Sequence, residues 1–369
     1  MLVHVKRKDL LAAASQTARA APRATSVEAI RGIHVDADGR RSMLTLTATN
    51  FEITIQATLM AAVEQPGSMV IDAALFTTVL SKLPEEDVDL ELEKNGRIVI
   101  RSGQCQFRMS VLSGDKYPMP ELPFPDDTLP VSGLCSLARN TIFAVSDDKA
   151  ASPQMKCVRL HIGPEGLKAS TSNGFCIVEA DGDQTCRGQS ELLLPAHALK
   201  TLAAISRDSD VYEMGLAGKS LVFWNGTLLF SARLVEGHYP DTADILLRFQ
   251  GTYSVHLEAR DLRNAIETVA SVAERNARVE LAFGEHEIIL STDSYLGRSS
   301  ASVKALVLNA PSKPLYYNHK KLLEYLNLTK GKITLEFDAS GLLAIRTGSI
   351  RYLQSPMRPP TKTAAGKAA

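Results

Sequence analysis

Hydrophobic and polar residues alternate along much of this chain, and segments with helical periodicity lie between the alternating runs. In "FRMSVL", residues 107–112, and "LFSARL", residues 229–234, apolar side chains occupy every second position, which is the period of a β-strand. The segment 260–274 instead places Leu262 and Ile266 on one face of a helix. The pattern therefore predicts a mixture of strands and amphipathic helices, joined by short polar turns.

Several landmarks recur at the interval of one small domain. Strands that end in a polar residue are followed by glycine at intervals of 123 and 122 residues, at Gly103, Gly226 and Gly348. Amphipathic helices are predicted to begin 123 residues apart, at Asp72, Pro195 and Asn318. A polar joint between two strands falls at Asn50, Asn173 and Asp293, and Tyr-Pro follows the alternating runs at Tyr117 and Tyr239. Repetition on this scale predicts tandem copies of one domain.

We predict three such copies, at residues 1–122, 123–246 and 247–358, followed by a polar tail at 359–369 that is expected to be disordered. Each copy has a helix early, then strands, a second helix and further strands. Strands joined by tight turns favour antiparallel pairing. The predicted class is α+β, with a two-helix, antiparallel-sheet domain in each copy. The segments 119–130 and 240–252 are interpreted as linkers.

Composition is that of a globular protein, with 45% hydrophobic and 22% charged residues. Lys and Arg number 41, as do Asp and Glu, so the net charge favours no class of partner. No apolar run is long enough to cross a bilayer, and charges near the N-terminus argue against a signal peptide. We therefore expect a cytoplasmic protein with no membrane partner. The five scattered cysteines are expected to be reduced thiols.

Sequence motifs for catalysis or metal binding are missing. The eight histidines include no HxH or HExxH pair, and no GxSxG nucleophile motif occurs. The segment "GLAGKS", residues 215–220, resembles a phosphate-binding loop but has Glu213 where that motif needs glycine. We therefore predict no catalytic residues, no metal and no cofactor. An enzyme built on Cys176 and a histidine, and a scaffold that binds only proteins, remain as alternatives.

The predicted helices carry an excess of basic residues over acidic ones. Residues 6–23 and 318–332 contribute most of this excess, and the acidic surplus lies elsewhere in the chain. A helix face of this kind suits a phosphate backbone, although an ordinary solvated face has a similar composition.

Several segments together resemble the beta subunit of bacterial DNA polymerase III, the sliding-clamp family. These are "RKDLLAA" near the start, "IRSGQCQFRMSVL" at the end of the first copy, "LVEGHYPD" at the end of the second and "YLQSPMRP" at the end of the third. The resemblance covers residues 1–358. It implies a six-domain ring made by a head-to-tail homodimer, which encircles double-stranded DNA without sequence specificity. It also implies partners: a DNA polymerase, a clamp loader and other proteins with a clamp-binding motif. No catalysis is implied.

The resemblance also implies functional residues. The DNA-binding residues would be Arg19, Arg23, Lys149, Lys200, Arg207, Lys320 and Lys321. The pocket for partner peptides would consist of Met155, Ser172, Gly174, Phe175, Cys176, Ile177, Pro240, Asp244, Ile245, Leu353, Ser355, Pro356, Met357 and Arg358. Phe107 and Met109 of one chain would meet Val272 and Ala273 of the other in the dimer; ordinary core packing is the alternative for these four.

The chain departs from the family pattern at the predicted pocket. Phe175 and Cys176 stand where a His-Arg pair is usual, Ser355 where a large apolar residue is common, and Asp244 where a basic one is common. The first copy has "TSVEAIRG" in place of a proline-leucine segment. These changes suggest a divergent clamp with an altered preference for its partners.

Overall fold

Two compact units divide the chain in the computed structural model. The first unit holds residues 1–134 and 197–234, and the second holds residues 135–196 and 235 to the C-terminus. The second predicted copy is thus shared between the units, and the division into three copies stays a prediction. The structure describes residues 1–84, 86–122, 124–164, 166–182, 190–273, 277–294 and 297–360. The predicted tail, from residue 361 on, lies outside the described residues.

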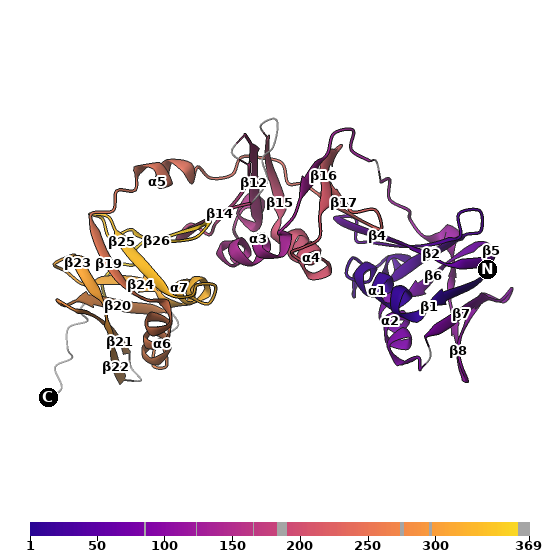
Figure 1. Cartoon of the computed structure of the whole chain (residues 1–369), viewed down its shortest axis with the longest axis horizontal. Helices are drawn as coiled ribbons and strands as arrows, with labels where there is room; N and C mark the ends of the chain where they lie inside the picture. Colours follow the sequence, from indigo (N-terminus) through magenta and orange to yellow (C-terminus); the bar gives the residue numbers. More distant parts are fainter. Residues whose placement is uncertain are drawn as a thin grey trace. The chain divides into compact units, whose positions relative to one another are not determined.

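Among its described residues, the first unit contains two sheets and three α-helices, labelled in Figure 1. The five-stranded sheet has the order β5-β1-β7-β8-β9, formed by β1 (Leu2–Lys6), β5 (Ala62–Gln65), β7 (Asp87–Leu92), β8 (Arg97–Ser102) and β9 (Cys105–Ser110). The nine-stranded sheet has the order β10-β6-β2-β3-β4-β18-β17-β16-β11. Its strands are β2 (Gly32–Asp38), β3 (Met43–Thr49), β4 (Ile53–Met60), β6 (Gly67–Asp72), β10 (Leu112–Ser113), β11 (Leu129–Val131), β16 (Tyr212–Ala217), β17 (Ser220–Trp224) and β18 (Leu228–Arg233). The helices are α1 (Arg7–Thr17), α2 (Ala73–Lys82) and α4 (Ala196–Ile205), with short helical turns η1 (Glu28–Arg31) and η2 (Gly114–Lys116).

The described residues of the second unit also form two sheets. The nine-stranded sheet has the order β15-β12-β13-β14-β27-β26-β25-β19-β23, and the four-stranded sheet has the order β22-β21-β20-β24. The first contains β12 (Cys157–Gly163), β13 (Gly166–Ser172), β14 (Cys176–Asp181), β15 (Ser190–Pro195), β19 (Tyr253–Glu258), β23 (Leu306–Asn309), β25 (Lys332–Phe337), β26 (Leu343–Thr347) and β27 (Ile350–Gln354). The second contains β20 (Arg278–Phe283), β21 (Glu287–Ser294), β22 (Gly297–Lys304) and β24 (Leu315–Asn318). The helices are α3 (Leu134–Thr141), α5 (Ala243–Arg248), α6 (Ala259–Ala270) and α7 (His319–Leu326), with turns η3 (Ile142–Ala144) and η4 (Pro153–Lys156).

Every strand pair among the described residues is antiparallel, which confirms the predicted α+β class. The three helices predicted to begin at Asp72, Pro195 and Asn318 each begin one residue later. Asp72 caps its helix by accepting the N–H of Leu75 at 2.9 Å, and Asn318 caps α7 by accepting the N–H of Lys320 at 3.0 Å.

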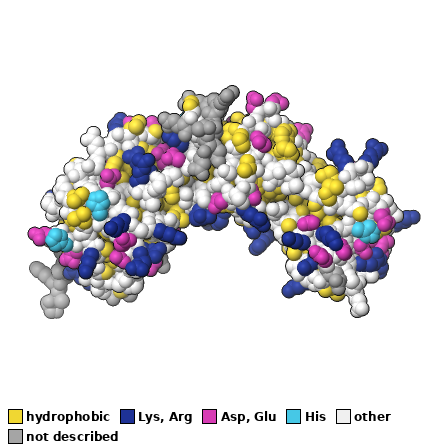
Figure 2. All heavy atoms as spheres, in the orientation of Figure 1, with side chains coloured by type: hydrophobic (Ala, Val, Ile, Leu, Met, Phe, Trp, Pro, Cys, Tyr) yellow, Lys and Arg dark blue, Asp and Glu magenta, His cyan; other side chains and the backbone are white. Residues whose placement is uncertain are grey.

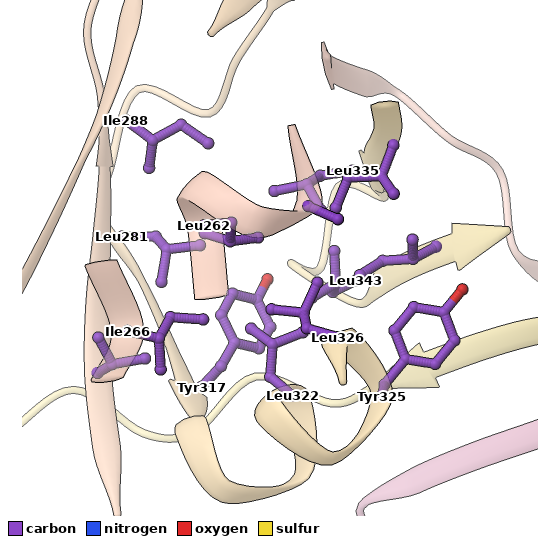
Figure 3. Close-up of a cluster of buried hydrophobic side chains, with 14 of the residues drawn as sticks. Leu262, Ile266, Leu281, Ile288, Tyr317, Leu322, Tyr325, Leu326, Leu335 and Leu343 are labelled. Atoms are coloured by element: carbon purple, nitrogen blue, oxygen red, sulfur yellow. The ribbon is translucent and has the colours of Figure 1, made fainter. Parts of the chain in front are cut away.

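The helices cover the sheets through apolar faces of the predicted kind. In the second unit, Leu262 and Ile266 of α6 and Leu322 of α7 are fully buried, and they pack with Tyr317 and Leu281 from the strands (Figure 3). The alternating pattern of the strands and the helical period of α6 thus converge on one core.

The recurring glycines lie in three equivalent hairpin turns, β8–β9, β17–β18 and β26–β27. Their φ angles are 56°, 95° and 56° at Gly103, Gly226 and Gly348. These values fall in the left-handed region, which residues with a side chain seldom adopt. The repeat of glycine along the sequence therefore reflects one backbone requirement that occurs three times.

The two Tyr-Pro segments also make equivalent contacts. The hydroxyl of Tyr117 accepts the backbone N–H of Thr49 at 2.9 Å, and the hydroxyl of Tyr239 accepts that of Ser172 at 2.7 Å. Burial raises the pKa of each phenol to about 12. Each tyrosine therefore satisfies a buried donor at the end of the strand before a joint.

Two features of the fold differ from the sequence interpretation. The segment 240–252, interpreted as a linker, contains the helix α5, which is too short to show a clear period. The joint in the third copy is also shifted by one residue. Ser294 and Gly297 close the hairpin between β21 and β22, as Asn50 and Ile53 close that between β3 and β4, so Ser294 rather than Asp293 holds the equivalent position.

Replacing Tyr239 by phenylalanine removes the acceptor for the buried N–H of Ser172. We expect the free energy of unfolding to fall by about 1–3 kcal/mol, the cost of an unsatisfied buried donor. Urea unfolding measures the change. The Tyr253→Phe variant is the control, because this half-buried phenol makes no hydrogen bond in the part of the chain that the structure describes. Equal loss in both variants would contradict the assigned role of the Tyr239 hydroxyl.

Candidate functional site

An apolar cluster lies on one face of the sheet where β14 pairs with β27. Ile177 and Leu353 are directly opposite each other in this pair, and both are buried. They pack with Leu246 and Ala344, while Phe249 and Leu342 border the cluster. Opposed side chains on adjacent strands are the basic unit of packing on a sheet face. We call these six residues the junction cluster.

The helix α5 covers the junction cluster. Leu246 points into the cluster, whereas Ile245 and Leu247 of the same helix are 44% and 84% exposed. The guanidinium of Arg351 donates to the carbonyl oxygen of Leu246 at 3.0 Å, which fixes the end of α5 over β27. Asp244 accepts from Arg248 one turn later at 2.8 Å. The helix therefore presents a half-exposed isoleucine beside the buried apolar cluster.

Cys176 lies on the opposite face of β14 from this cluster. Its thiol is buried with Val178 in the main core of the unit, and burial raises its pKa to about 12. Successive residues of a strand point to opposite faces, so Ile177 and Cys176 cannot both line one pocket wall. A buried thiol with a raised pKa is a poor nucleophile, which argues against an enzyme centred on Cys176.

The hairpin between β13 and β14 presents Phe175 to solvent, with 71% of the residue exposed. The Asn173 side chain accepts the N–H groups of Phe175 and Cys176 at 3.0 and 2.9 Å, and Ser172 accepts that of Gly174 at 3.1 Å. Gly174 has a φ of 86°. The tip is therefore held by side-chain caps of its own turn.

The segment after β27 is attached to this hairpin. The carbonyl oxygen of Phe175 accepts the N–H of Ser355 at 2.8 Å, and that of Tyr316 accepts the N–H of Met357 at 2.7 Å. Arg278 donates to the carbonyl oxygen of Arg358 at 3.5 Å. Pro356 and Met357 are half-buried, while Ser355 and Arg358 are exposed.

The structure thus brings together part of the predicted pocket. Ile177, Leu353, Phe175, Ser355 and Ile245 lie around the junction of β14 and β27, and Pro240 is exposed on the chain leading to α5. Met155 lies on η4, where its carbonyl oxygen accepts the N–H of Ser146, and it is not part of the junction cluster. Sequence reasoning missed Leu246, Ala344, Leu342 and Phe249. The run "ILLRF" was the available signal for Leu246 and Phe249.

A second candidate surface is a groove of about 720 Å³ beside α1 and α2 in the first unit. Arg19 and Arg23 line it, together with Arg31, Thr77 and Thr201. Arg31 lies 3.7 Å from Asp72 and was not among the predicted residues. Three guanidinium groups around one open groove suit phosphate oxygens.

The other predicted DNA-binding residues differ in whether their side chains are exposed to solvent. Lys149, Lys200, Arg207 and Lys320 are exposed. Lys321 is not, since its ammonium donates to the carbonyl oxygen of Phe143 at 2.9 Å and to Glu324 at 3.0 Å. Figure 2 shows Lys and Arg side chains interspersed with Asp and Glu over the visible face, in keeping with the net charge of zero.

Two strands with an open edge lie at the residues predicted for a dimer: β9 carries Phe107 and Met109, and β22 lies near Val272, which follows α6. β9 is the last strand of the five-stranded sheet, and Phe107 and Met109 on it are half-buried. β22 is the last strand of the four-stranded sheet. Next to it, the hydroxyl of Ser294 donates to the carbonyl oxygen of Val272 at 2.6 Å, which ties the end of α6 to the β21–β22 hairpin.

Within the described part of the chain, no group of His, Cys, Asp and Glu side chains is arranged to hold a metal ion. Across the same residues, no helix is both long and apolar enough to span a bilayer.

Comparison with known proteins adds three findings. The family model for the N-terminal domain of the DNA polymerase III beta subunit matches residues 1–123. The "Beta sliding clamp" of a Staphylococcus epidermidis strain is 26% identical over 352 residues, which is 90% of this chain and 92% of that protein. The beta sliding clamp of a Staphylococcus aureus strain matches at the same identity and coverage.

Solved structures show the same fold. The DNA polymerase sliding clamp from Bacillus subtilis aligns with a TM-score of 0.89 at 23% identity, covering 98% of this chain and 100% of that one. The beta subunit from the DNA polymerase of Streptococcus pyogenes aligns with the same TM-score at 21% identity, covering 97% of this chain and 100% of that one.

Proposed function

We propose that the chain is a member of the family of DNA polymerase III beta subunits and acts as a bacterial DNA sliding clamp. In this role it makes and breaks no bond. Two copies form a ring around duplex DNA and tether the replicative polymerase and other partners. Three tandem copies of one domain, at residues 1–122, 123–246 and 247–358, supply half of that ring. We place this activity in the cytoplasm.

One observation carries the proposal: two junctions between predicted copies lie within the chain, and equivalent strands pair in the same register in both. β4 pairs with β18, with Ile55 opposite Phe230, and β14 pairs with β27, with Val178 opposite Tyr352. The strands left over are β22, which follows the third joint, and β9, which ends the first copy. Pairing β22 of one chain with β9 of another repeats the junction and removes two open edges.

The burial of aromatic residues supports this closure. Phe230 and Tyr352 are fully buried at the two junctions within the chain. Phe107 is separated from its hairpin glycine by the same number of residues as Phe230 and Tyr352 are from theirs. It is nevertheless only half-buried in the single chain. A second copy placed against β9 would complete its burial, with Val272 and Ala273 on the same side.

Binding to DNA would be topological rather than base-specific. The guanidinium groups of Arg19, Arg23 and Arg31, which line one groove, would contact phosphate oxygens, and such contacts carry no sequence information. Contacts to phosphate are weakened by salt, so the ring can slide while the closed topology prevents dissociation. Tethering raises the effective concentration of a bound polymerase at the primer end.

The junction cluster is the proposed docking site for partner peptides, with Ile245 and Phe175 at its rim. Pockets of this kind take aliphatic or aromatic anchors on an apolar floor. The residues that depart from the family pattern do not all affect this site. Phe175 adds an exposed aromatic ring at the rim, whereas Cys176 faces the core and changes no contact with a peptide. The altered partner preference would therefore come from Phe175, Asp244 and Ser355.

Retention on circular DNA tests the ring. After loading by a bacterial clamp loader onto a nicked circular duplex, the protein should stay bound in high salt and leave once the circle is cut. Arg19→Glu combined with Arg23→Glu should reduce the yield of loading, since it places negative charge in the basic groove. Arg41→Glu, on an exposed turn, is the control. Loss of the wild-type protein from uncut circles would instead favour a scaffold that binds only proteins.

Binding of a clamp-binding peptide tests the docking site. Ile245→Ser should weaken the affinity about tenfold, or about 1.4 kcal/mol, because it removes an apolar contact at the rim. Leu247→Ser is the matched control, since this residue lies on the same helix and is the more exposed of the two. Isothermal titration calorimetry measures both. Equal affinities for the two variants would show that the peptide binds elsewhere.

A further inference from the structure

The two junctions within the chain define which residues meet when a third junction forms. In each junction, one opposed pair faces the core: Ile55–Phe230 in the first and Val178–Tyr352 in the second. The residue that precedes Ile55 or Val178, and the residue opposite it, point to the outer face. Thr54 lies opposite Ser231 in the first junction, and Ile177 lies opposite Leu353 in the second. Both outward pairs are uncharged, and each is compatible with close approach of the two strands.

The same register can be applied to a pairing of β22 of one chain with β9 of a second chain. On β9, the turn at Gly103 places Phe107 where Phe230 and Tyr352 stand in the other hairpins. On β22, the hairpin closed by Ser294 and Gly297 places Ser299 where Ile55 and Val178 stand. The burial of the strand agrees, since Ala301 and Val303, which share the face of Ser299, pack against the core.

On this register, Arg298 of one chain lies opposite Arg108 of the second chain. This pair is equivalent to Thr54–Ser231 and Ile177–Leu353 in the two junctions within the chain. We propose that this pair of arginines opposes ring closure, so that the closed ring is labile at low ionic strength and is tightened by screening salt. The inference rests on the proposed ring. Like charges directly opposite on neighbouring strands destabilise the pairing.

The charges around this pair do not remove the mismatch. Arg298 is exposed and makes no ion pair among the described residues, although Asp293 is its neighbour in register on β21. Arg108 is paired with Glu93 of its own chain at 2.9 Å. Farther along β22, Lys304 lies opposite Glu287. The acidic groups thus belong to the same chains as the two arginines, and the pair directly opposite across the proposed seam consists of two cations.

The second junction within the chain shows the opposite arrangement. There Glu179 lies opposite Arg351, a pair of complementary charges on the outer face. The corresponding residues across the seam would be Ser300 and Gln106, which carry no charge. The seam therefore lacks the favourable pair of the second junction and has an unfavourable one beside it.

A consequence is that salt acts in opposite directions on the two functions of the ring. Phosphate contacts weaken as salt rises, because the release of each condensed counterion into a more concentrated solution gains less entropy. Repulsion between Arg298 and Arg108 weakens too, because the Debye length shortens to a few ångströms. Higher salt would thus loosen contacts with DNA while closing the ring.

Sedimentation equilibrium of the full chain tests the inference. Between about 0.02 M and about 0.5 M NaCl, the dissociation constant of the wild-type dimer should fall. Arg298→Glu creates an opposite-charge pair with Arg108 and should tighten the dimer roughly tenfold at low salt, since two seams change at once. Lys313→Glu is the control for net charge, because this exposed residue lies outside the edge strands. Reversing both arginines, Arg298→Glu with Arg108→Glu, should restore the weak dimer.

The outcomes separate the inference from the ring on which it rests. A wild-type dimer that is insensitive to salt, with Arg298→Glu no tighter than the Lys313→Glu control, would overturn the inference and leave the ring intact. Monomers under every condition, in the wild type and in Arg298→Glu, would overturn the ring and the inference together. A dimer seen only in high salt or only in Arg298→Glu supports both.

Discussion

Two antiparallel strand pairs join the predicted copies of this chain. In each pair, the strand that follows a polar joint lies beside the strand that ends the next copy. Each pairing extends a sheet across two predicted copies and leaves no edge at the point where they meet. Without β4 against β18 and β14 against β27, each copy would expose rows of unpaired N–H and C=O groups. Among the edge strands, β22 and β9 are the ones equivalent to these two pairs, so we propose that a second chain supplies the missing partner strand for each.

The candidate docking site follows from one of these pairings. Ile177 and Leu353 come from segments far apart in the sequence, and they meet because β14 and β27 run side by side. The outer face of that pair would be an exposed apolar patch if α5 did not cover it. Because α5 is a short helix with one buried leucine and one half-exposed isoleucine, it buries the patch and leaves an apolar side chain exposed beside it. On the proposed function, a junction needed for folding thus also provides a surface for partners.

Local signals in the sequence were enough to predict much of the fold. Glycine with positive φ, capping residues at Asp72 and Asn318, and the period of α6 each act over a few residues, so a pattern can reveal them. The orientation of Cys176 could not be predicted in this way, because it depends on which face of β14 meets the core. The engagement of Lys321 with Phe143 depends on packing between α7 and the turn η3, and the role of Leu246 depends on a helix of six residues. The identity of the edge strands also follows only from the assembled sheets.

The claim that the ring closes by a third copy of the internal junction is tested most directly by a disulfide across the seam. On the proposed register, Ser300 of one chain lies opposite Gln106 of the other, and opposed residues of antiparallel strands are close enough for a disulfide. With the exposed Cys105 replaced by serine, the combination of Ser300→Cys and Gln106→Cys should give, on mild oxidation, a covalent species of about twice 40.0 kDa. A chain with Lys313→Cys in place of Ser300→Cys should remain monomeric under denaturing conditions. Failure of the first pair to cross-link, or equal cross-linking by both, would contradict the account.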